Sequence, residues 1–297
     1  MSKAEAQDRI KKLRREINHH RYLKHVLDRQ EISDAAEDSL KHELAKLEER
    51  LPELITRDSP TQRVAGKALA KFEKVRHRAR MTSLNDAFSP EELSDWEGRV
   101  RKLLPPGRNR LTPCDYFAEA KGDGFAVSLL YENGVFKTGA TRGDGLIGEN
   151  VTVNLKTVDS IPLGIYAEDD EPIRKHKDIR AILESFPRVR RAVRHLPKIV
   201  EVRGEVYMAK TAFEILNRGQ KKMGLQTFAN PRNIAAGSVR QLNPEITASR
   251  RLSFFAWDLV TDLGQETHEE KHLIMKVLGF PTIPLTTVCR STKSVCR

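Results

Sequence analysis

The chain has 297 residues, a net charge of +11 and 39% hydrophobic residues, which allows one large domain or a large and a small one. Its mean hydropathy of −0.53 and pI of about 9.6 are typical of a soluble protein with a charged surface, and they favour a polyanionic partner such as nucleic acid. It has no apolar run near the ~20 residues of a membrane span and no signal-peptide core at its start, so we expect a cytoplasmic protein without a membrane partner.

The cysteines Cys114, Cys289 and Cys296 argue against a disulfide framework, because their number is odd and their spacing is wide. Cys289 and Cys296 have no nearby partners at the spacing of a zinc finger. We therefore expect no zinc site within the chain.

The first seventy residues predict a small helical unit. Apolar residues recur at helical spacing between residues 4 and 27. Asp34, with Glu37 three positions later, resembles a capping pair at the start of a second helix, which Pro52 ends. The segment 1–70 is too polar to bury a large core alone, so we interpret it as an accessory or interaction unit.

A third helix is predicted after an irregular link over residues 72–88. Ser89 and Pro90 mark its start, and the Pro-Pro-Gly sequence at 105–107 stops it. The buried stripe of this helix would contain Trp96, Val100, Leu103 and Leu104.

From residue 115 onward the pattern changes to strands. Residues 117–121 alternate, which places Glu119 and Lys121 on the same face of a strand. The glycines that follow turn the chain into a second strand. Further strands are predicted over residues 126–131, 135–142, 200–207 and 252–257, with Asn133-Gly134 as the hairpin turn between the first two. After Ile283 the sequence has no further regular pattern.

Lys121 and Asp123 are the first candidate catalytic residues. A lysine beside carboxylates can be a covalent nucleophile when its surroundings lower its pKa, but a lone Lys-x-Asp-Gly also occurs at many surface turns. Arg142 lies in the glycine-rich stretch 141–145. That stretch is either another hairpin turn or a loop that brings an arginine close to a phosphate or ribose.

Two charged segments each leave two interpretations open. Glu201, Arg203 and Glu205 share one face of the strand 200–207, where they are either solvated or the polar floor of a site. The basic segment 166–198 is interpreted as a solvated insertion, with a DNA-facing surface as the alternative.

Several stretches carry a resemblance to a known family: DSPTQRV at 58–64, EAKGDG at 119–124, ATRGDG at 140–145, RGE at 203–205 and FANPRNIAAGSVRQ at 228–241. Taken together and in this order, they resemble the N-terminal part of bacterial NAD-dependent DNA ligases, from about residue 8 to 290. Several long motifs in the right order are far more specific than Lys-x-Asp-Gly alone.

The resemblance implies an α+β fold. A small helical unit that recognises nicotinamide mononucleotide, residues 1–70, would precede a nucleotidyltransferase (ATP-grasp-like) domain of antiparallel sheets and helices, residues 71–297. It also implies DNA ligase activity in replication and repair, in which AMP passes from NAD to a lysine and then to the 5′-phosphate of a nick, where the 3′-hydroxyl displaces it. Mg²⁺ or Mn²⁺ would assist, and nicked double-stranded DNA would be bound without sequence preference.

The same resemblance assigns roles to individual residues. Lys121 would be the nucleophile that carries AMP, and Asp123 would act in the same motif. Arg232 and Arg240 would touch the DNA backbone. The residues expected to bind NAD are His25, Asp34, Ala35, Ala36, Glu37, Asp38, Ser83, Leu84, Glu119, Arg142 and Glu205.

The sequence also departs from the family's pattern. Lys24 and Glu37 stand where two tyrosines normally accompany the histidine and aspartates of the helical unit, so stacking on nicotinamide should be weaker. The family continues through two further lysine motifs, an OB-fold, a four-cysteine zinc module and helix-hairpin-helix repeats, usually ending in a BRCT domain. We therefore interpret residues 71–297 as a truncated domain, and we expect this chain alone to self-adenylate weakly or not at all and to lack full sealing activity.

Two rival functions remain open. An ATP- or GTP-using lysyl nucleotidyltransferase would resemble this chain only at the Lys-x-Asp-Gly core and would lack the helical unit before it. A non-catalytic nucleic-acid-binding remnant of a ligase is favoured by the basic charge and by Lys24 and Glu37.

Overall fold

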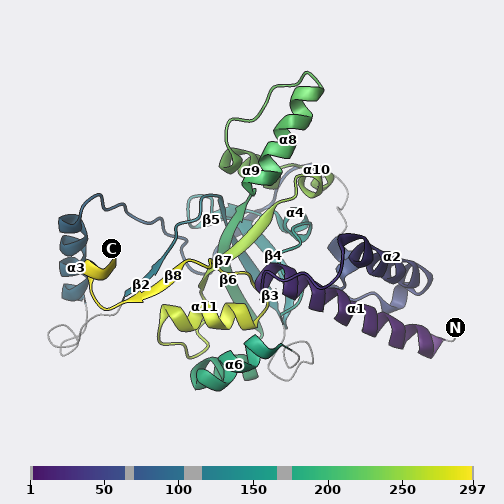
Figure 1. The fold of residues 1–297 in the computed structure, drawn as a ribbon, viewed down its shortest axis with the longest axis horizontal. Helices are drawn as coiled ribbons and strands as arrows, with labels where there is room; N and C mark the ends of the chain where they lie inside the picture. The colour runs from purple at the N-terminus through teal and green to yellow at the C-terminus, as the bar shows by residue number, and fades with distance from the viewer. Residues whose placement is uncertain (1–2, 64–69, 104–115, 166–175, 296–297) are drawn as a thin grey trace. The chain divides into compact units, whose positions relative to one another are not determined.

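The computed structural model describes residues 3–63, 70–103, 116–165 and 176–295 (Figure 1). They divide into a larger compact unit, residues 1–80 and 123–282, and a smaller one, residues 81–122 and 283–297. Both units combine helices with antiparallel strands, which confirms the predicted α+β class. No helix in these described ranges is long and apolar enough to cross a bilayer.

A four-stranded antiparallel sheet with the order β4-β3-β6-β7 forms the centre of the larger unit. Its strands are β3 (Phe125–Glu132), β4 (Val135–Thr141), β6 (Ile199–Tyr207) and β7 (Ser253–Leu259). The four strands predicted for this region are confirmed, with small shifts at their ends.

The turn between β3 and β4 is the predicted hairpin. Glu132 and Val135 are the last paired residues. Asn133 and Gly134 between them have positive φ angles of 51° and 77°, a conformation that asparagine and glycine adopt more readily than other residues. Such a two-residue turn matches the twist of the two strands.

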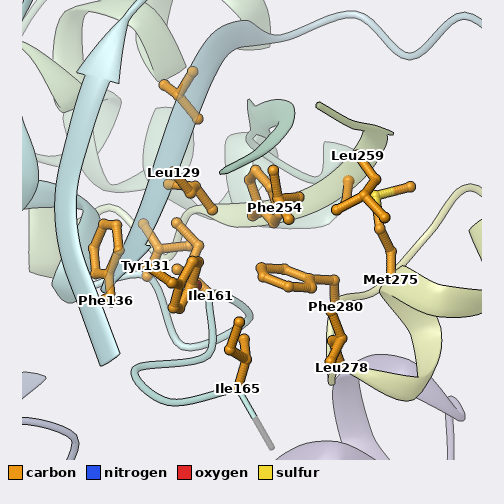
Figure 2. Close-up of a cluster of buried hydrophobic side chains, with 14 of the residues drawn as sticks. Leu129, Tyr131, Phe136, Ile161, Ile165, Phe254, Leu259, Met275, Leu278 and Phe280 are labelled. Carbon is orange, nitrogen blue, oxygen red and sulfur yellow. The ribbon is translucent and has the colours of Figure 1, made fainter. Parts of the chain in front are cut away.

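The main hydrophobic core covers the apolar face of this sheet (Figure 2). Tyr131 and Phe254 come from β3 and β7, and Phe280 follows α11 (His268–Val277) in the chain. The Phe280 ring meets Tyr131 edge-on, with 5.5 Å between the ring centroids, a geometry that aromatic pairs favour. The Tyr131 hydroxyl donates a 2.6 Å hydrogen bond to the carbonyl of Pro162, so this buried polar group is satisfied.

The predicted N-terminal helices are confirmed as α1 (Lys3–Val26) and α2 (Asp34–Arg50). They share a small core of their own, which contains Ile10, Leu13, Ile17, Leu44 and Leu47.

The C-terminal end of α1 is anchored to the main core of the larger unit. Tyr22 belongs to that core, and its hydroxyl donates to the carbonyl of Lys276 at 3.0 Å. The buried Arg21 guanidinium donates to the carbonyls of Gly279 at 3.1 Å and Ser160 at 3.4 Å. The helical hairpin is therefore held by backbone carbonyls as well as by apolar contacts.

The N-cap of α2 is Ser33, so the predicted capping pair of Asp34 and Glu37 is wrong by one position. Ser33 has an extended backbone, and its side chain accepts a hydrogen bond from the backbone N–H of Ala36 at 3.2 Å. Asp34 is therefore the first helical residue, and its side chain pairs with Lys24.

The described part of the basic segment, residues 176–198, is not a solvated insertion. It forms two amphipathic helices, α6 (Lys177–Ser185) and α7 (Pro187–Arg194), and α7 packs against α11. Ile179 and Val193 are fully buried in the main core. The sequence of this segment does contain apolar residues at helical spacing. They were overlooked because arginines lie between them. The rest of the predicted segment lies outside the described residues.

Further elements complete the larger unit. Asn230 caps α9 (Pro231–Val239), because its side chain accepts a hydrogen bond from the backbone N–H of Asn233 at 2.8 Å. The sequence did not predict α8 or α11. The elements are η1 (Pro52–Leu54), η2 (Pro60–Arg63), β1 (Lys74–Arg76), β5 (Ile147–Glu149), α4 (Thr152–Lys156), α8 (Lys210–Lys222), α9 (Pro231–Val239) and α10 (Pro244–Ser249).

In the smaller unit, β2 (Tyr116–Glu119) pairs with β8 (Thr286–Cys289) in an antiparallel ribbon. The expectation that regular structure ends after Ile283 is therefore wrong. Strand β8 is exposed along most of its length, so it lacks the apolar alternation that identifies a half-buried strand.

The predicted strand around Lys121 ends early. Glu119 is its last residue, and the backbone N–H of Ala120 donates to the carbonyl of Leu285 at 3.0 Å. Lys121 lies beyond the strand, and β2 and β3 belong to different sheets. The glycines that follow Lys121 have no side chain to pack and favour the chain leaving the ribbon there.

The helix predicted from Pro90 is confirmed as α3 (Pro90–Leu103), but its apolar stripe is not buried. Trp96, Val100 and Leu103 are 38%, 36% and 85% exposed, and Leu104 lies outside the described residues. A small unit has little interior with which to cover a helix face. The unit also contains α12 (Thr292–Val295).

Gly204 of β6 gives a direct test of this packing. A Cβ at Gly204 would lie 2.2 Å from the Phe254 ring and 2.3 Å from the carbonyl oxygen of Phe255. We expect Gly204→Ala to lower the free energy of unfolding by roughly 1–3 kcal/mol, the usual cost of overpacking, measured by denaturant titration.

The matched control is Gly219→Ala on α8, where a Cβ would meet nothing within 4 Å. Replacing a glycine inside an exposed helix should stabilise by up to about 1 kcal/mol. Equal stabilities of the two variants would contradict the close approach at Gly204.

Candidate active site

A cleft of about 460 Å³ opens in the larger unit, near the start of β3 and beside the β4–β5 loop and α9. This volume lies in the range of small-molecule sites. The cleft brings together Arg142, Glu205, Arg232 and Arg240, which were predicted as site residues on three separate segments. Its lining also includes Lys74, Gly124, Thr141, Gly148, Glu149 and Asn233.

Gly124 allows the backbone to approach β6 closely at the cleft. A Cβ there would lie 2.4 Å from the carbonyl oxygen of Val206 and 2.8 Å from the Glu205 side chain. Close packing therefore requires glycine at this position, because any side chain would displace Glu205.

The loop that carries Arg142 is a structured turn. Gly143 has a φ of 57°, and a Cβ there would lie 1.8 Å from the carbonyl oxygen of Ile147. The carboxylate of Asp144 accepts the backbone N–H groups of Ile147 and Leu146, each at 2.8 Å, and these bonds lower its pKa. Asp144 thus holds the turn that positions Arg142 at the cleft.

The charges at the cleft are arranged as ion pairs. Arg240 donates to Glu149 at 2.8 Å, and Lys74 lies 3.5 Å from the same carboxylate. Burial raises the pKa of Glu149, but Arg240 and Lys74 outweigh it, so the pKa is below its ordinary value. Arg232 lies 3.1 Å from Asp123. Since both of these side chains are more than half exposed, this pair is weak.

Two of the three charges on one face of β6 are buried, so the interpretation of that face as solvated is wrong. Glu201 and Arg203 are 4% and 6% exposed and lie 3.1 Å apart. Glu201 also accepts from the Ser128 hydroxyl at 2.9 Å, and Arg203 donates to the backbone carbonyls of residues 79–80. The two side chains form a polar layer beside Glu205 rather than a solvated surface.

The remaining predicted residues of the nucleotidyltransferase region lie in the smaller unit. Glu119 and Lys121 are exposed near the end of β2. Ser83 and Leu84 line a hollow of about 600 Å³ together with Trp96 of α3. Leu84 is 78% exposed there.

The helical hairpin brings the predicted nicotinamide segment against Lys24. The Lys24 ammonium lies 2.9 Å from Asp34 and 3.7 Å from Glu37, and Glu37 also pairs with Lys41 at 2.6 Å. Hydrogen bonding and charge from Lys24 lower the pKa of Asp34. Ala35 and Ala36 of the first turn of α2 are exposed, and so is Asp38, which follows that turn.

His25 is held neutral by its surroundings. Burial, together with the positive charge of Arg21, lowers its pKa to about 3. Lys24 and Arg63 act in the same direction, and only Asp159 opposes them. A neutral imidazole can accept or donate a hydrogen bond without repelling a cationic nicotinamide ring.

Sequence reasoning missed two residues at the cleft, Lys74 and Glu149. Lys74 lies in a segment predicted to be an irregular link, and Glu149 follows the Arg142 turn. They meet because β1 pairs with β5 in register, Lys74 opposite Glu149. Neither short strand has a periodic pattern that a sequence could show.

Two family models match this chain. The family model described as "NAD-dependent DNA ligase adenylation domain" matches residues 69–181 and 174–297. The one described as "DNA ligase-like, N-terminal NAD+-binding domain" matches residues 3–65.

The curated relatives include proteins named DNA ligase from Acetivibrio thermocellus, which is 45% identical over 97% of this chain, and from Syntrophomonas wolfei, 43% identical over 98%. Another, from Myxococcus xanthus, is 43% identical over 92%. The chain spans 38%, 39% and 37% of the length of these three relatives.

The depressed pKa of His25 predicts a pH dependence of stability. Below its ordinary pKa of 6.5, the unfolded chain takes up a proton that the folded chain does not, so the free energy of unfolding falls as the pH falls from 6.5 towards 3. Between pH 7.5 and 5 this amounts to about 2 kcal/mol. We expect the free energy of unfolding of His25→Gln to fall by that much less between pH 7.5 and 5 than that of the wild type, measured by urea unfolding at both pH values.

His176 also has a pKa lowered by burial, to about 4. It contributes equally to the loss of stability of the wild type and of His25→Gln. The difference between wild type and variant therefore reports on His25. If both lose the same stability between pH 7.5 and 5, the imidazole of His25 is not held neutral.

Proposed function

This chain belongs to the NAD-dependent DNA ligase family, through its adenylation domain, and we propose that it transfers the adenylyl group of NAD to Lys121 and from there to the 5′-phosphate of a nick in double-stranded DNA. The observation that carries the proposal is the cleft. Arg142 and Glu205 come from distant segments and line it together with Gly124, which follows Lys121 by three residues.

Covalent geometry limits the distance between Lys121 and the cleft. Three residues span at most about 11 Å when fully extended, so the Cα of Lys121 stays within that distance of the Cα of Gly124 in any arrangement of the two units. A lysine side chain can cover much of this distance. Lys121 is thus tethered to the group of charges that would hold a nucleotide.

In the proposed reaction, the neutral amine of Lys121 attacks the adenylyl phosphorus of NAD. A nitrogen–phosphorus bond forms, the bond to nicotinamide mononucleotide breaks, and the amine loses a proton. The 5′-phosphate of the nick then displaces lysine, which recovers a proton. The 3′-hydroxyl finally attacks the activated phosphate and releases AMP, which joins the two strands.

The charged side chains of the cleft suit the phosphate chemistry. Arg142 would stabilise negative charge that develops on the transferred phosphate. Mg²⁺ (or Mn²⁺) would lower that charge further, and the carboxylates of Glu149 and Glu205 at the cleft are the oxygen ligands that Mg²⁺ uses together with substrate phosphates. Glu119 and Glu205 would orient the AMP moiety, with Ser83 and Leu84 also contacting NAD.

The helical hairpin would receive the nicotinamide end of NAD. We propose that His25 and the segment Asp34 to Asp38 form this subsite, with residues 1–70 acting as the recognition unit and residues 71–297 as the nucleotidyltransferase domain. The low pKa of His25 supports this proposal, because nicotinamide in NAD carries a positive charge that a protonated histidine would repel.

Arg232 and Arg240 would contact the phosphate backbone of DNA. Each already faces a carboxylate, Asp123 and Glu149 respectively, so a DNA phosphate would exchange one anionic partner for another. Such contacts position the duplex without reading its sequence, and they weaken as salt concentration rises. This is the behaviour required of an enzyme that seals nicks in replication and repair.

One observation favours a second candidate, a non-catalytic nucleic-acid-binding remnant of a ligase. Lys24 occupies the proposed nicotinamide subsite and is paired with Asp34 at 2.9 Å. If this pair closes the subsite, NAD would not bind, and the basic chain would still attract DNA.

A labelling experiment tests the proposal. We expect NAD labelled in its adenylyl group to transfer label to the chain, at well below one label per chain, with peptide mapping placing it on Lys121. Lys121→Ala should remove the label completely, because no other amine replaces the nucleophile. ATP labelled in the same position should transfer none.

The control is Lys137→Ala, since Lys137 is an exposed lysine of β4 outside the cleft lining. It should be labelled as the wild type is. Label on another residue, or equal labelling by ATP, would contradict the proposal. The absence of any label, with nicked-DNA binding unchanged by NAD and by Lys121→Ala, would establish the remnant instead.

A further inference from the structure

A cluster of metal-ligating side chains lies in the larger unit, away from the cleft. One ring nitrogen each of His19 and His20 and one carboxylate oxygen of Glu31 all lie within 4.8 Å of one another. His19 Nε2 is 3.5 Å from Glu31 Oε2. Ligands in a tetrahedral zinc site with bonds of about 2.0–2.1 Å are about 3.3–3.4 Å apart. The His19–Glu31 pair already has nearly this separation, and small side-chain rotations bring the third ligand in.

The convergence of the two histidines is unusual for a helix. Consecutive positions on an α-helix point about 100° apart, so their side chains normally diverge. Here the His19 and His20 ring centroids are only 5.1 Å apart. His176, which precedes α6, stacks on His19 with 4.8 Å between the centroids and 15° between the planes. Tyr22 stacks on His176 in turn at 4.5 Å, so packing fixes the plane of the His19 ring.

Buried ring nitrogens in this cluster have no hydrogen-bond partner. Within the part of the chain that the structure describes, nothing bonds to Nδ1 of His19, Nδ1 of His20 or Nε2 of His176, although these atoms are buried. Buried polar atoms are normally satisfied. His19 meets Glu31 through its other ring nitrogen, Nε2, so within the proposed ligand set the unsatisfied Nδ1 of His20 is the atom that points to a missing ligand.

We propose that His19, His20 and Glu31 bind a divalent transition-metal ion of the zinc class. Imidazole nitrogens suit zinc, copper and nickel, and two histidines with one carboxylate form a known zinc ligand set that leaves a fourth position for water. No cysteine takes part, which is why the spacing of the cysteines gave no sign of it.

The position of the site would let the metal ion link two parts of the helical hairpin. Glu31 lies in the loop between α1 and α2, two residues before the Ser33 cap, whereas His19 and His20 lie on α1. A metal ion shared by them ties this loop to the helix. It thereby sets the start of α2, where Asp34 pairs with Lys24. The metal stabilises the hairpin whether or not a nucleotide is present.

The test uses the chain without a polyhistidine tag, stripped of metal with a chelator. Zn²⁺ is titrated by calorimetry, and Co²⁺ by visible absorption, which reports tetrahedral coordination. We expect one equivalent to bind. His20→Gln and Glu31→Gln should each weaken Zn²⁺ binding by at least about tenfold. Zn²⁺ should also raise the melting temperature of the wild type and not that of Glu31→Gln.

The matched control is His42→Gln, an exposed histidine on α2 of the same hairpin, which should bind Zn²⁺ as the wild type does. Because Glu31 is exposed, its replacement leaves the fold intact. The proposal is overturned if the wild type binds no Zn²⁺, if both site variants bind as tightly as the wild type, or if His42→Gln weakens binding as much as His20→Gln. In those cases the cluster is only a close approach of two histidines and a glutamate and binds no metal ion.

Discussion

The buried ion pair between Arg203 and Glu201 joins the central sheet to the segment that precedes the smaller unit. Two charges can be buried only when each also has hydrogen-bond partners. Here Ser128 donates to Glu201, and Arg203 donates to the carbonyls of residues 79–80. The alternation of β6 that turns these side chains away from the apolar core also turns Glu205 to the same side. The alternation of β6 therefore places Glu205 on the polar side of the sheet, where it lines the cleft.

The cleft itself is an arrangement of opposite charges that a substrate can rearrange. Arg240 and Lys74 face Glu149, and Arg232 faces Asp123. The Arg232–Asp123 pair is exposed on both sides and contributes little stability, so it costs little to separate when a phosphate or a metal ion arrives. By contrast, Gly124 and the turn held by Asp144 are rigid features, because the backbone itself makes the close contacts.

Much of this could be predicted from the sequence, and the failures have physical causes. The strands of the central sheet were predicted because half-buried strands alternate, and the Asn133-Gly134 turn was predicted because few residues adopt positive φ. The basic helix α7 was mistaken for part of a solvated insertion, since its four arginines outnumber its buried residues Val189, Ala192 and Val193. Strand β8 was missed because an exposed two-stranded ribbon needs no apolar pattern.

The sequence by itself determined the family, the α+β class and the identity of the candidate site residues, because motifs in a fixed order and local periodicity are properties of the chain. Only the tertiary structure decided which charges meet. Lys74 and Glu149 are 75 residues apart and pair across two short strands. Glu31 reaches His19 through a loop, and Lys121 lies beyond its strand rather than on it. Contacts between distant residues depend on register and packing, which no local pattern encodes.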